Sequence, residues 1–284
     1  MSITSLYLDA FVACARQRNF TRAATLLNIT QSALSQRIAS LESELGTALL
    51  IRDRTGVRPT PAGETLLRYG IAREALESET LRAIKPAKRG AELGGTIRIA
   101  AFSSVLRSVI LPSLEKLVAD HARIKLQVMS RELSEIPALL RSGAVDYVIV
   151  TDPIVLEGIA SVPIGVERNV LIERRNYSGP DIFLDHDEND PTTIAWCKLA
   201  RRSTRIERRF LDDVYGLIDG VRLGWGRAVV PEHLIVGDSE IQVTETKTVL
   251  QVPVHLQFFE QPYYTKLHDV LFNAITSGAR RILG

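Results

Sequence analysis

A three-residue polar turn between two helical patterns restricts the fold of this chain more than any other feature of its sequence. Residues 22–27 and 31–45 carry apolar side chains at helical spacing, and Asn28-Ile29-Thr30 separates them. The small side chains of Ala23 and Ala24 allow the two helices to approach closely. This spacing is typical of the helix-turn-helix of DNA-binding domains.

Polar residues and glycine mark the ends of these helices. Thr21 can cap the helix that begins at residue 22, and Gly46 ends the helix over residues 31–45. A further helix with a buried face is expected over residues 3–16, and Asn19 breaks the pattern after it. Three consecutive helices therefore form the N-terminal unit.

A short hairpin is expected after the third helix. Residues 48–51 can pair with Val57 around residues 52–56, where glycine supplies the turn and arginine supplies charge. A hairpin in this place is typical of the wing of a winged helix-turn-helix.

A long helix follows, which Thr60-Pro61 can cap and begin and which Pro86 ends. Its apolar stripe consists of Ala62, Leu66, Leu67, Ile71, Ala75, Leu76, Leu81 and Ile84. A domain of about 60 residues cannot bury a stripe of this length alone, so we expect the helix to pair with a second subunit rather than lie on the surface.

Residues 85–95 are expected to form a linker, because they hold one proline and three glycines. After this linker the sequence pattern changes from helices alone to alternating strands and helices. Strands are expected over residues 96–101, 125–129 and 147–150, and helices over residues 104–119 and 133–142. Such alternation indicates a parallel sheet with helices on both faces, which binds ligands at the carboxyl ends of its strands.

The polar residues that follow these strands are candidates for ligand binding. They are Ser103, Ser104, Arg131, Thr151 and Asp152. Ser103 and Ser104 would offer hydroxyls and N–H groups at a helix N-terminus, which favours a carboxylate or phosphate. The alternative is that these two serines simply cap the helix.

A second, shorter α/β cycle predicts a second lobe. Its strands are expected over residues 169–172, 182–184, 205–211, 228–230 and 252–259, and its helices over residues 191–199 and 213–223. A terminal helix over residues 266–283 would return to the first lobe. Two lobes with a cleft between them would result, and His186 and Trp225 would face the first-lobe candidates from lobe two.

Two charged runs occur in the second lobe. His186-Asp187-Glu188 has no further ligands at metal spacing and reads as an exposed acidic loop, so neither a metal nor any other cofactor is predicted. The arginines at positions 201, 202, 205, 208 and 209 could serve an anionic effector or another subunit, or form a solvated face.

The charge of the chain is unevenly distributed. Residues 1–90 hold 13 Lys and Arg against 8 Asp and Glu, although the net charge of the chain is only +2. A local excess of positive charge is what a domain that docks on phosphate carries.

Several functional classes find no support in the sequence. No apolar run approaches the roughly 18 residues of a membrane helix, and the first eleven residues lack the pattern of a secretory signal, so we expect a cytoplasmic protein without membrane contact. Cys14 and Cys197 are expected to be buried thiols rather than a redox pair. No nucleophile elbow, P-loop, dinucleotide fingerprint or zinc-protease motif is present, so we predict that the protein is not an enzyme.

These residues together resemble the LysR-type transcriptional regulators over nearly the whole chain. The resemblance rests on FTRAA at residues 20–24, LNITQSALSQRI at 27–38, LESELG at 41–46 and TPAG at 60–63, with weaker matches in GAVDY at 143–147 and GWGRAVVP at 224–231. Leu50, Pro59 and Trp225 depart from the family pattern. The segment over residues 170–205 is also shorter than is common in the family, which indicates an altered pocket in lobe two.

The predicted fold is an α/β protein with an N-terminal, mainly helical winged helix-turn-helix, a long linker helix and a two-lobed sensor domain like a periplasmic binding protein. The predicted boundaries are residues 1–60 for the DNA-binding domain, 61–90 for the dimerisation helix and 91–284 for the effector-binding domain. Within the last, lobe one covers residues 91–162 and 262–284, and lobe two covers residues 163–261.

In a helix-turn-helix, the first residues of the second helix reach base edges in the major groove. The candidates for base contact are therefore Gln31, Ser32, Ser35 and Gln36, whereas Ala33, Leu34, Ile38 and Leu41 should turn inward. Candidates for phosphate contact are Arg37, Arg52, Arg54 and Arg58. The alternative is that the polar residues form only a solvated helix face.

The predicted function is sequence-specific regulation of transcription, modulated by a small-molecule effector of unknown identity. A two-fold dimer would bind double-stranded DNA at an inverted-repeat operator. The resemblance further implies a homotetramer built from two such dimers and contact with RNA polymerase. The alternatives are a two-lobed binding protein without a DNA role, a regulator with a degenerate pocket that needs no effector, and, more distantly, a small-molecule enzyme with a DNA-binding appendage.

Overall fold

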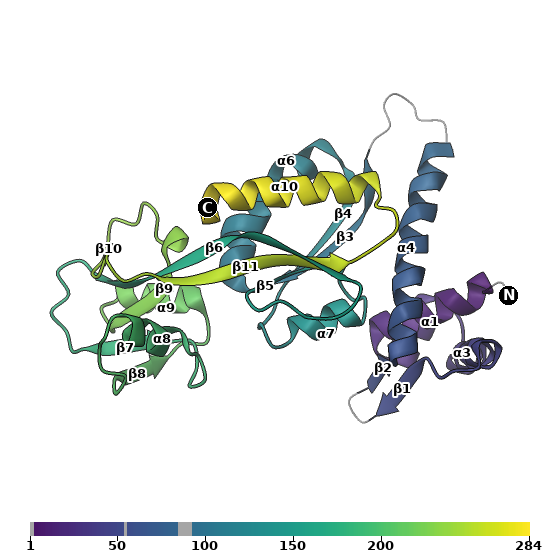
Figure 1. The fold of residues 1–284 in the computed structure, drawn as a ribbon, viewed down its shortest axis with the longest axis horizontal. Coiled ribbons are helices and arrows are strands. Elements are labelled where there is room, and N and C mark those ends of the chain that lie inside the picture. The colour runs from purple at the N-terminus through teal and green to yellow at the C-terminus, as the bar shows by residue number, and fades with distance from the viewer. Residues whose placement is uncertain (1–2, 54–55, 85–92) are drawn as a thin grey trace. The chain divides into compact units, whose positions relative to one another are not determined.

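The computed structural model describes residues 3–53, 56–84 and 93–284, and the chain divides into two compact units (Figure 1). Unit 1 comprises Met1–Ala101, Lys116–Ser161 and Leu256–Phe272, and unit 2 comprises Phe102–Glu115, Val162–His255 and Asn273–Gly284. The N-terminal helices therefore belong to the same unit as the first strands of the α/β region.

Unit 1 begins with the three helices that the sequence predicts. They are α1 (Ser5–Gln17), α2 (Phe20–Leu26) and α3 (Gln31–Leu45). Phe20, Leu34 and Ile38 are buried in their common core together with the small Ala23 and Ala24. The predicted helix-turn-helix is confirmed, including the close approach that the two alanines allow.

The start of α2 differs from the prediction. The side chain of Asn19 accepts a hydrogen bond from the backbone N–H of Arg22 at 3.0 Å, so Asn19 is the cap and the helix begins at Phe20. The assignment of Thr21 as the cap is wrong, because Thr21 lies inside the first turn. Thr30 caps α3 as its position suggests, with its hydroxyl accepting from the N–H of Ala33 at 3.1 Å.

The wing is a two-stranded antiparallel hairpin of β1 (Leu50–Asp53) and β2 (Gly56–Pro59), and its turn lies outside the described residues. The first strand begins two residues later than predicted. The N–H of Val57 donates to the carbonyl oxygen of Arg18 at 3.1 Å, which ties the wing to the end of α1.

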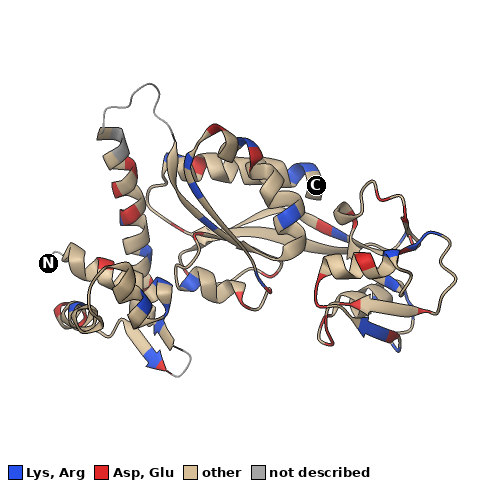
Figure 2. Ribbon diagram, turned by 180° about the vertical axis from the view of Figure 1, so that it is seen from behind, with Lys and Arg blue, Asp and Glu red and all other residues tan. Residues whose placement is uncertain are grey.

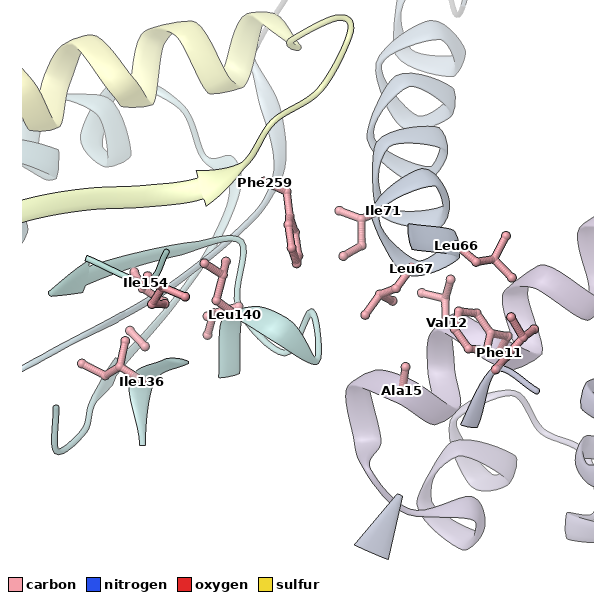
Figure 3. Packing of buried hydrophobic residues seen from close by; sticks show 14 of the residues in the cluster. Phe11, Val12, Ala15, Leu66, Leu67, Ile71, Ile136, Leu140, Ile154 and Phe259 are labelled. Carbon is pink, nitrogen blue, oxygen red and sulfur yellow. The ribbon is translucent and has the colours of Figure 1, made fainter. Parts of the chain in front are cut away.

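The long helix α4 runs over Pro61–Ile84, and its cap is Thr60, whose hydroxyl accepts from the N–H of Gly63 at 3.0 Å. Leu66, Leu67 and Ile71 are buried in one cluster with residues of α1, and the same cluster includes Phe259 (Figure 3). The first half of the predicted apolar stripe is therefore covered within unit 1. Leu81 and Ile84 are 52% and 71% exposed.

The sheet of unit 1 has the strand order β4-β3-β5-β11. Its strands are β3 (Gly94–Ala101), β4 (Arg123–Ser130), β5 (Tyr147–Val150) and the end of β11 (Leu250–Phe259). β3 pairs in parallel with both β4 and β5, which confirms the predicted β-α-β alternation. Helix α7 (Ile136–Arg141) starts later than predicted, because Pro137 fits only in the first turn of a helix.

The helix after β3 is interrupted by a π-helical turn. It consists of α5 (Ser103–Val105), the π-turn η1 (Leu106–Ile110) and α6 (Leu111–Asp120), where a single helix over residues 104–119 was predicted. Such turns hold one extra residue and occur frequently at functional sites.

Unit 2 is a mixed sheet in the order β11-β6-β9-β7-β8, with β10 paired to β6. Its further strands are β6 (Ile159–Arg174), β7 (Ile182–Asp185), β8 (Glu207–Phe210), β9 (Arg227–Pro231) and β10 (Ile241–Val243). Its helices are α8 (Thr192–Leu199), α9 (Val214–Arg222), the short 3-10 turn η2 (Glu232–Leu234) and the second part of α10 (Lys266–Leu283). Unit 2 also includes α5, η1 and the start of α6. The sequence did not predict β10 or the full length of β6.

Cys14 and Cys197 are both free and buried, as expected for structural thiols. Burial raises the pKa of the Cys14 thiol to about 12, and the nearby Arg52 offsets this only in part. Among the described residues, no helix is long and apolar enough to cross a membrane, and no group of three or more metal-binding side chains occurs.

Candidate DNA-binding surface and ligand-binding residues

Helix α3 separates its polar and apolar residues cleanly. Gln31, Ser32 and Gln36 are exposed, and Ser35 is half-buried. The side chains of Leu34, Ile38 and Leu41 are buried on the opposite face, as predicted, whereas Ala33 is only half-buried. The face predicted for base contacts is therefore accessible from the solvent.

The first turn of this helix is held by side-chain hydrogen bonds. The hydroxyls of Thr30 and Ser32 are 3.0 Å apart, and the hydroxyl of Thr21 lies 3.5 Å from the amide oxygen of Gln31. These contacts restrict the rotamers of the two leading residues, Gln31 and Ser32, before any partner binds.

The wing positions two of the predicted arginines. The guanidinium of Arg52 lies over the ring of Phe20, 3.8 Å from its centroid, so α2 supports this side chain. Arg58 approaches Asp53 across the hairpin, with 3.4 Å between Nε and Oδ2. Arg37 on α3 is half-buried, and Arg54 lies outside the described residues.

Sequence reasoning passed over Arg22, which is exposed in the first turn of α2 and whose backbone N–H donates to the cap Asn19. A helix N-terminus carries positive partial charge and free N–H groups, which favour phosphate. The signal that could have found Arg22 is its position three residues after Asn19. Figure 2 shows that Lys and Arg also occur along the other elements of the chain, so charge alone does not mark this surface.

The two serines after β3 have different surroundings. The hydroxyl of Ser104 donates to Oε1 of Glu167 at 2.7 Å, and both residues are buried. Ser103 is half-buried, and its hydroxyl lies 3.5 Å from Oδ1 of Asp213. Neither side chain caps the helix, so the alternative of a simple cap is wrong.

Glu167 belongs to a chain of buried and half-buried polar groups that the sequence did not predict. Nε2 of His233 lies 3.0 Å from the same carboxylate oxygen, and Nδ1 of His233 lies 2.9 Å from the hydroxyl of Ser108. The Ser108 hydroxyl also lies 2.6 Å from the carbonyl oxygen of Ser104, to which it can donate. The chain of contacts therefore joins the helix after β3 to Glu167 on β6 and His233 in η2.

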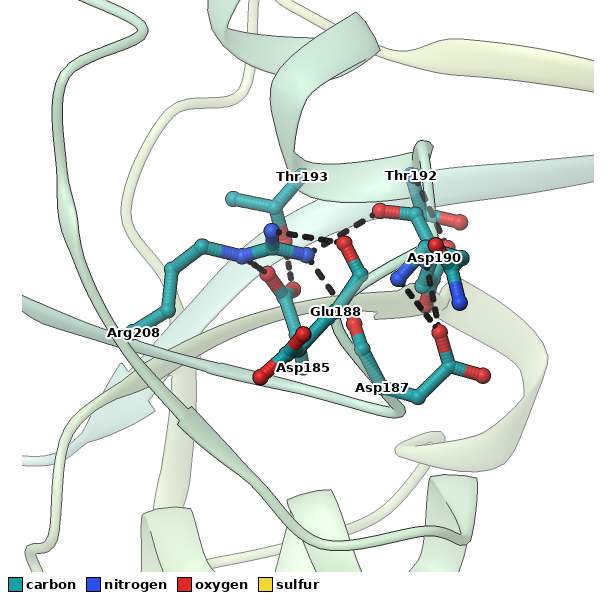
Figure 4. A network of polar contacts seen from close by, with 8 residues as sticks. Asp185, Asp187, Glu188, Asp190, Thr192, Thr193 and Arg208 are labelled. Carbon is teal, nitrogen blue, oxygen red and sulfur yellow. Dashed lines mark hydrogen bonds and ion pairs between the residues drawn. The ribbon is translucent and has the colours of Figure 1, made fainter.

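An arginine organises the acidic loop that contains His186 (Figure 4). Arg208 pairs with the buried Asp185, and its terminal nitrogens donate to the carbonyl oxygens of Asp187, Glu188 and Asp190 at 3.1–3.2 Å. This arginine of the basic cluster therefore holds the loop. His186 lies 3.3 Å from the Asp187 carboxylate.

The remaining predicted ligand residues lie at chain positions open to solvent. Arg131 follows β4 and Asp152 follows β5, and both are exposed, while Thr151 is half-buried. Arg131 donates from its guanidinium to the carbonyl oxygen of Ser130 at 2.7 Å. Trp225 in unit 2 is 47% exposed.

Two known protein families match consecutive parts of the chain. Residues 7–64 match "Bacterial regulatory helix-turn-helix protein, lysR family", and residues 90–258 match "LysR substrate binding domain". The chain belongs to the LysR family, and it is a LysR-type transcriptional regulator with a DNA-binding helix-turn-helix and a two-lobed α/β effector-binding domain. The resemblance drawn from its motifs is thereby confirmed.

Individual relatives support this assignment. A putative transcriptional regulator of Pseudomonas aeruginosa is 41% identical over 123 residues, which are 42% of this chain and only 39% of that protein. The regulator IlvY of Escherichia coli is 24% identical over 94% of this chain and 95% of its own length.

Solved structures show the same fold over the whole chain. ArgP from Mycobacterium tuberculosis superposes with a TM-score of 0.78 at 23% identity, covering 98% of each chain. LysG from Corynebacterium glutamicum with bound effector Arg gives 0.75 at 20% identity, covering 99% of each chain.

Proposed function

We propose that the protein binds double-stranded DNA at a specific sequence through α3 and that a small molecule in its C-terminal domain modulates this binding. The observation that carries the proposal is the polarity of α3, whose exposed first turn is polar and whose opposite face is buried. Gln31, Ser32, Ser35 and Gln36 are the proposed base contacts. The proposed phosphate contacts are Arg22, Arg37, Arg52, Arg54 and Arg58.

One recognition helix reads only a few base pairs, so we propose that a homodimer addresses two half-sites of an inverted repeat. The exposed end of α4, with Leu81 and Ile84, supports pairing through this helix. Assembly into a homotetramer and contact with RNA polymerase are proposed on the family resemblance alone.

The proposed effector-binding residues are Ser103, Ser104, Arg131, Thr151, Asp152, His186 and Trp225. The contact of Ser103 with Asp213 favours an effector that carries a hydrogen-bond donor or amino group beside its acceptor groups. Buried Ser104 would act through the position of Ser103 rather than by touching the effector. No cofactor is proposed.

Three alternatives remain distinguishable by experiment. A two-lobed binding protein would bind ligand but select no DNA, a regulator with a degenerate pocket would select DNA but bind no ligand, and an enzyme would convert its ligand. We propose a cytoplasmic, non-enzymatic regulator, because the matching relatives are transcriptional regulators.

The test is selection of genomic DNA fragments by the purified protein at one fixed salt concentration. Wild-type protein should enrich inverted repeats, and a protein with both Gln31→Ala and Ser35→Ala should lose that enrichment while it stays folded. Equal, salt-sensitive binding of all fragments by the wild type would contradict the assignment of α3 as the recognition helix.

A further inference from the structure

Unit 1 contains a cavity of about 300 Å³ between its helical N-terminal part and its sheet. One wall is formed by Ile71, Glu74, Ala75 and Ser78 of α4 together with Arg16 of α1. At about 30 Å³ per water molecule in the liquid, this volume holds roughly ten waters and is at the lower end of small-molecule sites.

The opposite wall consists of the first residues of parallel strands. Thr96 lies beside Lys125 in the register of β3 and β4. Because side chains alternate between the faces of a strand, Arg98 shares the face of Thr96, and Arg123 shares the face of Lys125. Four side chains from two strands therefore point to the same side, and all four line the cavity.

The charges of the lining are unbalanced. Arg16, Arg98 and Lys125 stand against two carboxylates, Glu74 and Asp146. Arg16 pairs with Glu74 at 2.6 Å, and Arg98 lies 3.5 Å from Asp146. The two carboxylates leave the charge of Lys125 uncompensated beside a partly enclosed space, where an anion is attracted more strongly than in open water.

Apolar and aromatic side chains complete the lining. Phe258, Phe259 and His268 come from the end of β11 and the start of α10, and Figure 3 shows Phe259 and Ile71 pointing toward one another. A ligand that fits both the charges and these surfaces carries an anionic group on a short carbon skeleton.

This cavity is separate from the proposed effector site. Its residues from the three parallel strands stand at the amino ends of β3, β4 and β5, whereas Arg131 and Asp152 follow the carboxyl ends of β4 and β5. Lys125 and Arg131 are six residues apart along and just beyond β4, which at about 3.3 Å per residue is roughly 20 Å.

We propose that this cavity binds a small organic anion, a carboxylate or a phosphate ester, which contacts Lys125 and Arg98 on the sheet and faces α4. Such a ligand touches both the helix that carries the DNA-binding part and the strands of the effector-binding domain. Its binding stabilises the arrangement of unit 1 in which these elements are packed together.

The test uses full-length protein without DNA and measures binding by titration calorimetry. The probes are glutarate and phenyl phosphate, with the uncharged glutaramide as the matched control ligand. Glutarate or phenyl phosphate should bind to the wild type, and which of them binds distinguishes a carboxylate ligand from a phosphate ligand. Glutaramide should not bind.

The variants are chosen to keep the fold. Lys125→Gln removes an exposed charge and should weaken binding at least about tenfold, which corresponds to ~1.4 kcal/mol. Ala75→Leu fills the cavity from the side of α4 and should have a similar effect. Lys198→Gln, an exposed lysine of unit 2, and Ser103→Ala, at the proposed effector site, should bind as the wild type does.

The proposal is overturned if neither anion binds to the wild type, or if both cavity variants bind the anion with unchanged affinity. The result is independent of the DNA selection, since neither probe nor variant involves α3 or the wing.

Discussion

Nε of Arg16 donates a hydrogen bond to the carbonyl oxygen of Gly143 over 3.1 Å, which joins the last turn of α1 to the turn that follows α7. Arg16 and Gly143 are separated by 127 residues in the sequence. The contact places the end of α1, the first helix of the N-terminal helical part, directly on the turn after α7 within unit 1.

Gly143 is held in a conformation that favours glycine, with φ of +65°, and a Cβ there would lie 2.7 Å from Cδ1 of Ile71. Gly143→Ala should therefore lower the free energy of unfolding by the cost of the left-handed backbone, about 1–2 kcal/mol, and by a further cost for moving Ile71. Urea unfolding measures this. The matched control is Gly46→Ala, where φ is +66° and nothing lies within 4 Å. An equal loss in both variants would show that Ile71 moves freely.

Ser104→Ala should destabilise unit 2 by about 1–3 kcal/mol, because Glu167 would lose a donor while it stays buried. Ser103→Ala is the control, since its contact with Asp213 is long, at 3.5 Å, and only half-buried. We expect it to cost less than about 0.5 kcal/mol in the same unfolding measurement. A larger loss for Ser103→Ala than for Ser104→Ala would refute the assigned hydrogen bonds.

The thiol of Cys14 should not react in the folded protein. With its pKa raised to about 12, only roughly one molecule in ten thousand carries the thiolate at pH 8. Native protein treated with a disulfide reagent and analysed by peptide mass should show no label at Cys14, whereas protein in guanidinium should label fully. Complete native labelling within minutes would mean that α1 opens readily.

Acid should weaken the packing of α10 through His268, which accepts or donates a 2.7 Å hydrogen bond with Tyr147 and stacks on Tyr264. Burial lowers the pKa of His268 below 6.5, with Asp269 acting in the opposite direction. The unfolded chain takes up its proton near pH 6.5 and the folded chain only at lower pH. The stabilisation is therefore complete above pH 6.5 and is lost as the pH falls below that value.

The measurement is urea unfolding at pH 7.5 and pH 5.0. His268 should lower the free energy of unfolding of the wild type by at most about 1.4 kcal/mol per pH unit over this range. The His268→Gln variant should lose less free energy of unfolding over the same range. An identical pH dependence in both proteins would exclude His268 as its source.

Arginine and glutamine on the DNA-binding surface should differ in their effects. Arg58→Gln removes a proposed phosphate contact and should reduce the slope of log affinity against log salt by about 0.9 without changing the preferred sequence. Gln31→Ala should keep the salt slope and relax preference at one base pair by about 1–3 kcal/mol. Filter binding over a salt series with matched and mismatched sites separates the two. A changed sequence preference in Arg58→Gln would make Arg58 a base contact.

Local signals made the helical part of the fold predictable. The bounds of α3 follow from Thr30, which caps its first turn, and from Gly46, which ends its last turn. The start of α2 was misplaced because Asn19 and Thr21 are both good caps and lie two residues apart. Strand β10 escaped prediction because a three-residue strand has no periodicity of its own.

The candidate site was less predictable than the fold. The serines at the end of β3 could be found from strand order, but the partner of Ser104 is 63 residues away and that of Ser108 is 125 residues away. Pairings over such separations depend on strand register and side-chain direction, which one sequence does not specify. The cavity beside α4 combines residues of α1, α4, α10 and four strands for the same reason.

The π-turn over Leu106–Ile110 determines the directions in which the side chains before and after it point from the helix. Each residue of an α-helix advances the direction of the side chains by about 100°, so the extra residue rotates Ser103 and Ser104 by that amount relative to the residues after Ile110. A chain with one residue fewer here would remain a plain α-helix of nearly the same length and would point different side chains at His233. The single extra residue in this helix therefore determines which side chains take part in the polar network at His233.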